Sequence, residues 1–435
     1  MAVMKQAQQG AVTLLITTLL LVLALVVALG SYRSLFFQIK RAQNEVQARQ
    51  QHWRAEGGLE CGYSHIVNNK NSSIPNNLNT LCVDLELTYL SADPTNASAL
   101  MSQYQMTTLK KNILFQRGRS PGAIRSTSDL IVFGSTLISP PDPGPKNSDG
   151  KYECAAIAVA KYVIATAGVT NNGVGSAIQK PSAVFDNSAD CAPTHKTNSS
   201  SQSGIWKNSS GLYEAVNVKN DIYRDETLNP FKDLFGYERG EWEKARDDTE
   251  FKFLSYTMTS GDVDCVSKFK GALVLGQPNQ VWIDGSCQLN QASIDTMSTI
   301  QNAHPGTYLF LLVHNGVLGI RGSGSIQGVL FHFNSGFAAD TANWNGFDTE
   351  LIADLNANFD APIKTLYGSA TTLTPKHATY LQSGSFQFTG GMAFDTQGQI
   401  ALFYNSLRLQ YNSDIENSFS FSVPPRWQKG SWNDL

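Results

Sequence analysis

An uncharged run of 20 residues near the amino terminus, residues 11–30, constrains the fold of this chain more than any other feature. At the helical rise of 1.5 Å per residue, about 20 apolar residues cross the hydrocarbon core of a bilayer. A secretory signal has a shorter apolar centre, of about 7–15 residues, followed by a small-residue cleavage site. Here the run is longer and its flank, GSYRSLFF, is a poor cleavage site, so we expect the segment to be retained.

A helical pattern continues beyond the apolar run. Apolar residues recur at three- and four-residue spacing, which predicts a stripe on one face of an amphipathic helix, interrupted at Arg49. The stripe consists of Tyr32, Leu35, Ile39, Ala42, Val46 and Trp53. Gly57 and Gly58 then act as helix stop signals. We therefore expect one helix over residues 11–56, about 69 Å long, with an apolar first half and a one-sided second half.

The six cysteines form three neighbouring pairs along the chain. They are Cys61, Cys82, Cys154, Cys191, Cys265 and Cys287. None belongs to a CxxC motif or has a histidine at zinc-finger spacing, so we expect no structural zinc. Disulfides, and hence an oxidising compartment, are the favoured interpretation over six buried thiols. Pairing of neighbours would close three local loops, each stabilising the fold by about 3–4 kcal/mol, but spacing alone does not fix the connectivity.

The remainder of the chain predicts a large β-rich head, which makes the fold class α+β. We expect a head region with disulfide-stapled loops over residues 57–265 and a β-rich region over residues 266–435. In the latter, short apolar strands alternate with Gly, Asn or Asp turns, which indicates rungs of a partial parallel β-solenoid. An antiparallel sheet or sandwich is the alternative.

Sequence motifs that would identify a class of enzyme are few: the chain has no P-loop or HExxH motif, and we predict no GxSxG nucleophile elbow. His304, His314 and His332 lie in or near the predicted strands, and we interpret them as core or surface histidines rather than metal ligands. The net charge of −3 favours neither a polyanionic nor a polycationic partner. We therefore expect a binding protein and no enzyme, with no cofactor and no metal.

One basic stretch, without an acidic residue, is a candidate DNA-contact patch, since DNA phosphates attract such charge. Its cations are Lys110, Lys111, Arg117, Arg119 and Arg125. An ordinary solvated surface is the alternative interpretation.

The leader MAVMKQAQQG and the long helix that follows resemble type IV pilins and the pseudopilins of type II secretion systems. The resemblance covers about residues 1–60. It implies that a prepilin peptidase cuts after Gly10 and methylates Ala11. It also implies that the apolar half of the helix anchors the subunit in the inner membrane, with the head in the periplasm, and later packs in the filament core. A single-span, membrane-anchored periplasmic protein is the plainer alternative.

Leu15 departs from the pilin pattern, which usually has Glu as the fifth mature residue. In the family, that Glu is thought to neutralise the amino terminus of the subunit above. An unpaired carboxylate in lipid is costly, and a tip subunit has no subunit above it. Leu15 therefore indicates a tip or initiating subunit, in which residues 11–30 pack against neighbouring pilins and the stripe holds the head.

The chain most resembles the PilX-like minor pilins. This resemblance implies a partner set of other minor pilins, the major pilin and the prepilin peptidase, and a final location outside the cell at the pilus tip. Priming of pilus assembly and tip capping are the implied functions, with adhesion to a surface ligand or DNA uptake as additions. A capping pseudopilin and a membrane-anchored periplasmic β-solenoid carbohydrate-binding or carbohydrate-active protein are the alternatives.

The charges that flank the apolar run argue against this topology. Arg33, Lys40, Arg41 and Arg49 follow the run, while Lys5 precedes it, and the positive-inside rule would place the more basic flank in the cytoplasm. The cysteines and the leader favour a periplasmic head, and we adopt that orientation.

Overall fold

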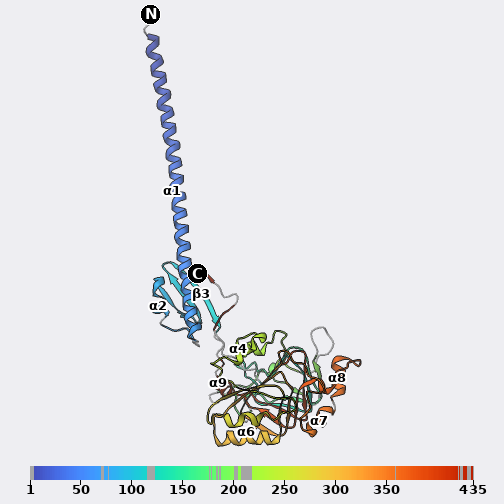
Figure 1. Ribbon diagram of the computed structural model, residues 1–435. Coiled ribbons are helices and arrows are strands. Elements are labelled where there is room, and N and C mark those ends of the chain that lie inside the picture. Colours follow the sequence, from blue (N-terminus) through green and yellow to red (C-terminus); the bar gives the residue numbers. More distant parts are fainter. Residues whose placement is uncertain are drawn as a thin grey trace. The chain divides into compact units, whose positions relative to one another are not determined.

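The chain divides into two compact units, residues 1–116 with 424–435 and residues 117–423 (Figure 1). The computed structural model describes residues 4–69, 73–76, 78–114, 123–175, 177, 179–182, 185, 188–199, 204–206, 218–357, 359–419, 421, 425–428 and 433–434. The boundary that we expected at 265/266 falls inside the second unit, because strands on both sides of it belong to the same sheets.

The first unit consists of a long helix and an antiparallel sheet. Helix α1 (Met4–Asn68) is followed by α2 (Leu78–Leu81) and the 3-10 turn η1 (Val83–Leu85). The sheet has the order β1-β2-β3-β25, and β26 also pairs with β3. Its strands are β1 (Tyr89–Asp93), β2 (Asn96–Tyr104), β3 (Thr107–Leu114), β25 (Arg426–Trp427) and β26 (Asn433–Asp434). The end of the chain thus returns to the unit that contains its beginning.

Helix α1 continues through the predicted stop at Gly57 and Gly58, and Gly58 serves close packing rather than termination. A Cβ atom at Gly58 would lie 2.3 Å from Ser102 Oγ, so the bare backbone lets the helix approach β2. The helix buries Ala55, Leu59 and Ile66 completely in one cluster with apolar residues of the sheet. These positions follow helical spacing, so this later stripe joins the helix to the sheet.

Three disulfides link sequence neighbours: Cys61–Cys82, Cys154–Cys191 and Cys265–Cys287. The prediction of disulfides is confirmed, and the pairing is the local one. The first bond lies in the first unit and joins α1 to the segment after α2. The other two lie in the second unit.

Most strands of the second unit belong to three sheets. The eight-stranded sheet has the order β12-β7-β4-β22-β19-β16-β14-β13. Its strands are β4 (Ile124–Ser126), β7 (Ile157–Val159), β12 (Ile222–Arg224), β13 (Leu254–Thr257), β14 (Asn279–Asp284), β16 (Leu309–His314), β19 (Gly328–Phe333) and β22 (Met392–Asp395). All its neighbouring strands pair in parallel.

The seven-stranded sheet has the order β11-β8-β5-β23-β20-β17-β15 and is parallel except for β11. Its strands are β5 (Asp129–Phe133), β8 (Val163–Ala165), β11 (Gly204–Trp206), β15 (Cys287–Leu289), β17 (Leu318–Arg321), β20 (Ala378–Ser383) and β23 (Ile400–Tyr404). The smaller sheets, β10-β9-β6-β24 and β18-β21, contain β6 (Thr136–Ile138), β9 (Val169–Asn171), β10 (Asn198–Ser199), β18 (Gly324–Ile326), β21 (Phe386–Phe388) and β24 (Leu407–Leu409).

Strand order in space differs from strand order in sequence. The early strands β4, β5 and β6 pair with the late strands β22, β23 and β24. Between them the chain passes to the opposite edge of the eight-stranded sheet at β13 and returns through β14, β16 and β19. The second unit therefore joins segments that are more than 250 residues apart in sequence, as the pairing of Ile124 with Met392 illustrates.

Residues of the central strands are buried on both faces, which explains their almost continuous apolar sequences. In β16, Leu309, Leu311 and Val313 belong to one core cluster, whereas Phe310 and Leu312 belong to another. The second cluster includes aromatic side chains of α3 (Pro230–Phe235). Helices α7 (Thr349–Asn356) and α8 (Asp360–Tyr367) bury side chains against strands of the seven-stranded sheet. The coarse prediction of an apolar helix followed by a β-rich head in an α+β fold is confirmed.

Replacement of Gly328 by Ala is expected to destabilise the second unit. The added Cβ atom would lie 1.9 Å from the backbone oxygen of Leu309, the residue that pairs with Gly328 on β16. Backbone atoms cannot move aside as the end of a side chain can. We expect the free energy of unfolding to fall by at least about 1–3 kcal/mol. Gly271→Ala is the matched control, because a Cβ atom there meets nothing within 4 Å. Equal unfolding midpoints in urea for the two variants would contradict this packing.

Candidate functional site

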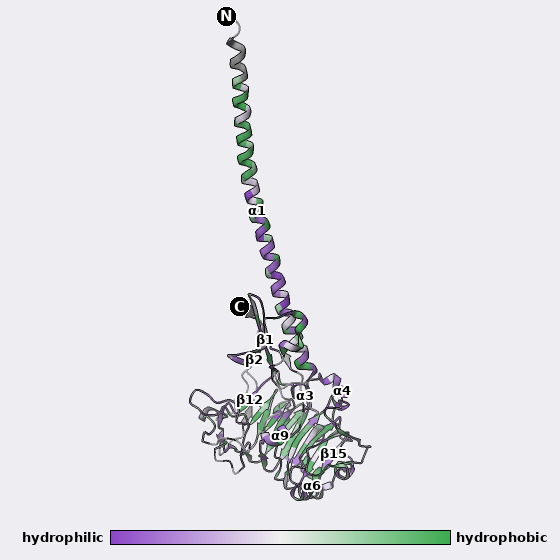
Figure 2. Cartoon of the chain, turned by 90° about the vertical axis from the view of Figure 1, so that its left-hand side faces the viewer, coloured by the Kyte–Doolittle hydropathy of each residue, from purple (hydrophilic) through white to green (hydrophobic). Residues whose placement is uncertain are grey.

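The first part of α1 is the largest exposed apolar element among the described residues. Residues 11–50 are exposed at every position, and burial begins only at Gln51. Figure 2 shows the apolar run in green, followed by a more polar stretch of the same helix. The helix is long and apolar enough to cross a membrane. Gly10 and Ala11, the predicted cleavage and methylation positions, lie within it.

The apolar run tolerates its threonines because their hydroxyls bond to the helix itself. Thr17 Oγ1 donates to the carbonyl oxygen of Leu14 at 3.0 Å, and Thr18 Oγ1 donates to that of Leu15 at 2.9 Å. Such bonds satisfy a hydroxyl without a partner from another helix. The Leu15 side chain is 64% exposed, so the position that usually holds Glu in pilins presents an apolar group to the surroundings.

The stripe predicted to hold the head is exposed and does not pack against the sheet of the first unit. The side chains are exposed, from 48% at Ile39 to 74% at Tyr32. Five of them precede Gln51, where burial of α1 begins, and Trp53 is 68% exposed although it lies beyond that point. The stripe residues are Tyr32, Leu35, Ile39, Ala42, Val46 and Trp53. Arg49, which interrupts the stripe, instead pairs with Glu45 across one helical turn at 2.7 Å.

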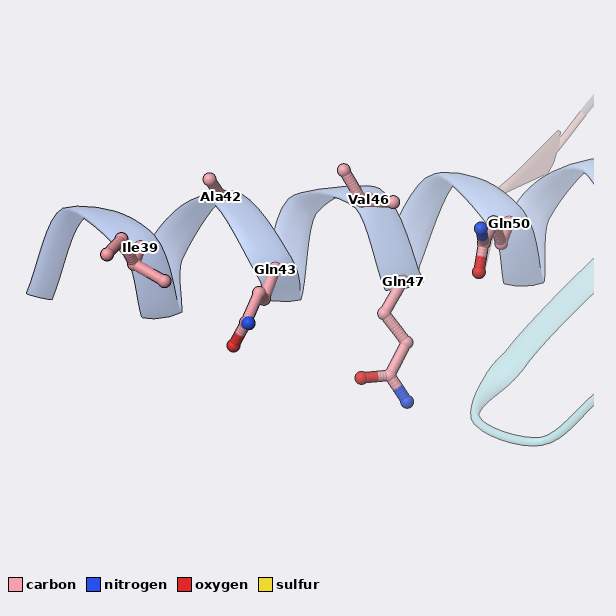
Figure 3. A pocket seen from close by; sticks show the side chains of 6 residues that line it. All are labelled: Ile39, Ala42, Gln43, Val46, Gln47 and Gln50. Atoms are coloured by element: carbon pink, nitrogen blue, oxygen red, sulfur yellow. The ribbon is translucent and has the colours of Figure 1, made fainter. Parts of the chain in front are cut away.

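A shallow, open depression lies along this part of the helix (Figure 3). Its lining residues are Ile39, Ala42, Gln43, Val46, Gln47 and Gln50. The lining combines three apolar side chains with three amides and has no charged group. A surface of this kind suits contact with another helix, since apolar residues pack while glutamines retain hydrogen-bonding capacity.

The cations of the predicted basic stretch belong to different units of the structure. Lys110 pairs with the buried Asp93 at 2.7 Å, and Lys111 lies 3.6 Å from Glu60 and over the ring of Trp427. Together with the bond from Thr95, the contact with Lys110 lowers the pKa of Asp93 to about 2. Arg125 lies on β4 in the second unit, and Arg117 and Arg119 lie outside the described residues. DNA contact stays a prediction.

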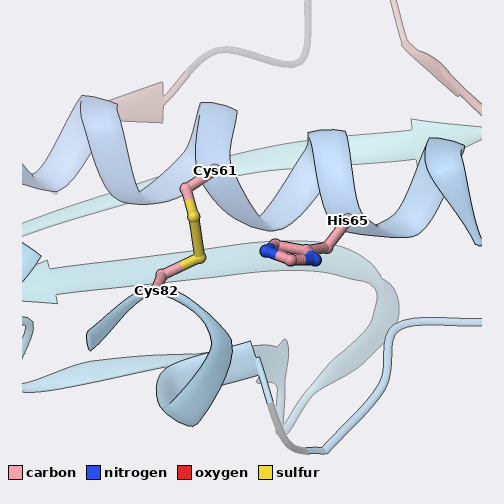
Figure 4. Close-up of side chains that lie close together, drawn as sticks. All are labelled: Cys61, His65 and Cys82. Carbon is pink, nitrogen blue, oxygen red and sulfur yellow. A yellow bond between two sulfur atoms is a disulfide. The ribbon is translucent and has the colours of Figure 1, made fainter. Parts of the chain in front are cut away.

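Cys61, His65 and Cys82 lie close enough together to suggest a metal site, but Figure 4 shows the two sulfur atoms joined in a disulfide. A metal requires free thiolates, so this cluster does not fit one. The disulfide instead fixes α1 to the segment that contains Cys82.

Buried ionisable groups occur in the second unit, and only the histidines among them were considered from the sequence. Asp395 is fully buried and accepts hydrogen bonds from Arg239, Thr127 Oγ1 and the Phe231 amide. Burial raises the pKa of Asp129 to about 6, although the Tyr367 hydroxyl donates to this carboxyl group. Burial lowers the pKa of His332 to about 4. For Asp395 and Asp129 the sequence offered no signal, since their surroundings depend on long-range pairing.

A second polar cluster lies at the ends of the strands β14 and β16. His314 Nδ1 lies 2.5 Å from Asp284 Oδ1, and His314 Nε2 lies 2.9 Å from Ser335 Oγ. Burial acts to raise the pKa of Asp284, but hydrogen bonds from His314 and Trp282 and the nearby Arg246 result in a lowered value. His314 is 1% exposed and His304 is exposed, as expected of core and surface histidines.

No protein-family model, curated protein or solved structure matches the chain.

Proposed function

We propose that this chain is a minor pilin of a type IV pilus, similar to the PilX-like proteins, which primes assembly and caps the filament tip. One observation carries the proposal: residues 11–50 form a helix exposed on all sides, while residues 51–68 anchor the same helix in the first unit. A helix with one free half and one anchored half offers its free surface to the membrane or to neighbouring helices while it carries a folded head.

The exposed stripe supports the same proposal. Soluble monomers rarely leave a long apolar surface without a partner, and such surfaces mark membrane or protein contacts. The residues 11–30 serve in the inner membrane before assembly, and the depression around Ile39 and Val46 receives neighbouring pilin helices afterwards. Leu15 adds no charge that would need a partner above, which fits a tip position.

We propose further that the second unit is a parallel β-solenoid that forms the tip-exposed head. The support is the parallel, in-register pairing of successive rungs such as β16–β17–β18 and β19–β20–β21 on the two large sheets and the β18-β21 sheet. Each rung buries apolar side chains against the next, which suits stacking of repeated units.

Substitution in the depression tests this function in cells that produce the protein. Ile39→Asp is expected to reduce pilus number to that of cells lacking the protein, because a carboxylate enters an apolar helix contact. The side chain is 48% exposed in the monomer, so the amount of folded, membrane-bound protein should not change. Glu45→Gln, also on the exposed helix, is the matched control. Normal piliation with a secretion defect would favour the capping pseudopilin, and no defect in either would contradict assembly through this surface.

A further inference from the structure

Three side chains with complementary chemistry meet at one end of the eight-stranded sheet. Asp284 ends β14, His314 ends β16, and Ser335 follows β19 by two residues. The parallel register pairs Asp284 with His314, and His314 with Phe333. Carboxyl ends of parallel strands meet at the same edge, so the fold brings residues from three successive strands together.

The distances permit the hydrogen-bond directions required of a nucleophile, a base and an orienting carboxylate. With Nδ1–H donated to Asp284 at 2.5 Å, His314 has its Nε2 lone pair free to accept from Ser335 Oγ–H at 2.9 Å. The alternative acceptor for this hydroxyl, Asn315 Oδ1, is farther away at 3.4 Å. A serine, a base within reach and an orienting third group are the diagnostic arrangement of an activated hydroxyl.

The histidine ring is held by its surroundings. Its ring centroid lies 4.2 Å from that of Trp242 and 5.1 Å from that of Phe333, with the Phe333 ring nearly parallel. Asp284 is fixed in turn by Trp282 Nε1, at 3.3 Å, and by Arg246, whose Nη1 lies 3.7 Å away. Catalytic groups act best when packing and hydrogen bonds restrict them to one geometry.

We propose that Ser335 and His314, positioned by Asp284, form an esterase site for short-chain acyl esters. Ser335 is exposed, and a Cβ atom on its neighbour Gly336 would meet nothing within 4 Å, so the nucleophile faces open space. The Gly336 amide, now 3.3 Å from Asn315 Oδ1, is the candidate donor to the developing oxyanion. An open site holds a small acyl group while the larger alcohol stays in solvent, as on an O-acylated polysaccharide.

The reaction follows two balanced steps. Ser335 Oγ adds to the ester carbon as its proton passes to His314 Nε2. The carbon–oxygen bond to the alcohol then breaks, and His314 returns the proton to the departing alkoxide. Water attacks the acyl-serine by the same route, which releases a carboxylic acid and restores the hydroxyl.

This activity does not depend on the proposed role in pilus assembly and is measured separately. Purified full-length protein in detergent is treated with a fluorophosphonate probe and assayed with p-nitrophenyl acetate. We expect a phosphonate adduct on the peptide that contains Ser335. Ser335→Ala should abolish it and lower kcat/KM by about 100-fold or more. Ser323→Ala, at another exposed serine of the same unit, should leave both readouts unchanged.

Asp284→Asn separates positioning from general stability. We expect kcat to fall with KM nearly unchanged, because the wrong tautomer of His314 impairs proton transfer but not ester binding. An unchanged circular dichroism spectrum should accompany the loss. Absence of an adduct on Ser335 in the folded wild type, or ester hydrolysis that survives Ser335→Ala, would overturn the proposal.

Discussion

Asp395→Asn should lower the free energy of unfolding of the second unit by about 3–5 kcal/mol. The Asp395 side chain is fully buried and pairs with Arg239, which is only 18% exposed. This carboxylate also accepts bonds from Thr127 at 3.1 Å and from the Phe231 amide at 3.1 Å. Loss of the Asp395 charge leaves the largely buried guanidinium of Arg239 without its counterion. It also weakens the hydrogen bonds through which the segments of Thr127 and Phe231 attach to β22.

Lys244→Gln is the control for this experiment. Lys244 pairs with Glu241 at 2.7 Å, but both side chains are largely exposed, so water screens the pair. We expect a change within about 1 kcal/mol. Urea unfolding of the full chain, followed by tryptophan fluorescence, provides the comparison. A similar small effect for both variants would mean that Asp395 does not hold these segments together.

Asp129→Asn should stabilise the protein at neutral pH but not at acidic pH. Burial raises the pKa of Asp129 from 3.8 to about 6, so the folded state holds this proton more tightly than the unfolded state. The contribution of Asp129 to the free energy of unfolding is fully present below about pH 4 and is lost as pH rises through about 6. At pH 7 the free energy of unfolding of the wild type is therefore lower by up to about 3 kcal/mol. The neutral amide of Asp129→Asn would retain this contribution.

The difference between the two proteins is the quantity to measure. His332 has its pKa lowered to about 4, so its contribution is present above about pH 6.5 and is lost as pH falls through 4. This opposite effect is common to both proteins and cancels in the difference. Thermal unfolding at pH 4 and pH 7 should give nearly equal midpoints at the lower pH and a higher midpoint for Asp129→Asn at the higher pH. A constant difference would show that Asp129 does not titrate in this window.

The sequence predicted those parts of the fold that depend on local patterns. Continuous apolar residues and helical spacing indicated the long helix, and alternation with turn residues indicated the β-rich head. The predicted end of the helix was wrong, because a pair of glycines can either end a helix or permit its close packing. Gly57 and Gly58 read as a stop signal, whereas contact with Ser102 shows that Gly58 permits close helix–sheet packing.

Long-range pairing was beyond sequence reasoning. Nothing local indicates that Ile124 pairs with Met392, or that Trp427 at the far end of the chain stacks on Tyr63 of the long helix. The domain boundary was misplaced for the same reason. The sequence shows that His314 and Ser335 are present, but only the strand register shows that they lie close to Asp284.

The most direct test of the assembly proposal is the intact mass of the amino-terminal peptide from membrane-extracted protein. Processing by a prepilin peptidase predicts a peptide that begins at Ala11 and carries one methyl group. That result would mean that the apolar run is retained for use in a filament. A peptide that begins at Met1 or Ala2 would contradict the pilin route and leave an ordinary membrane anchor, whereas a start beyond Gly30 would mean removal of the run during secretion.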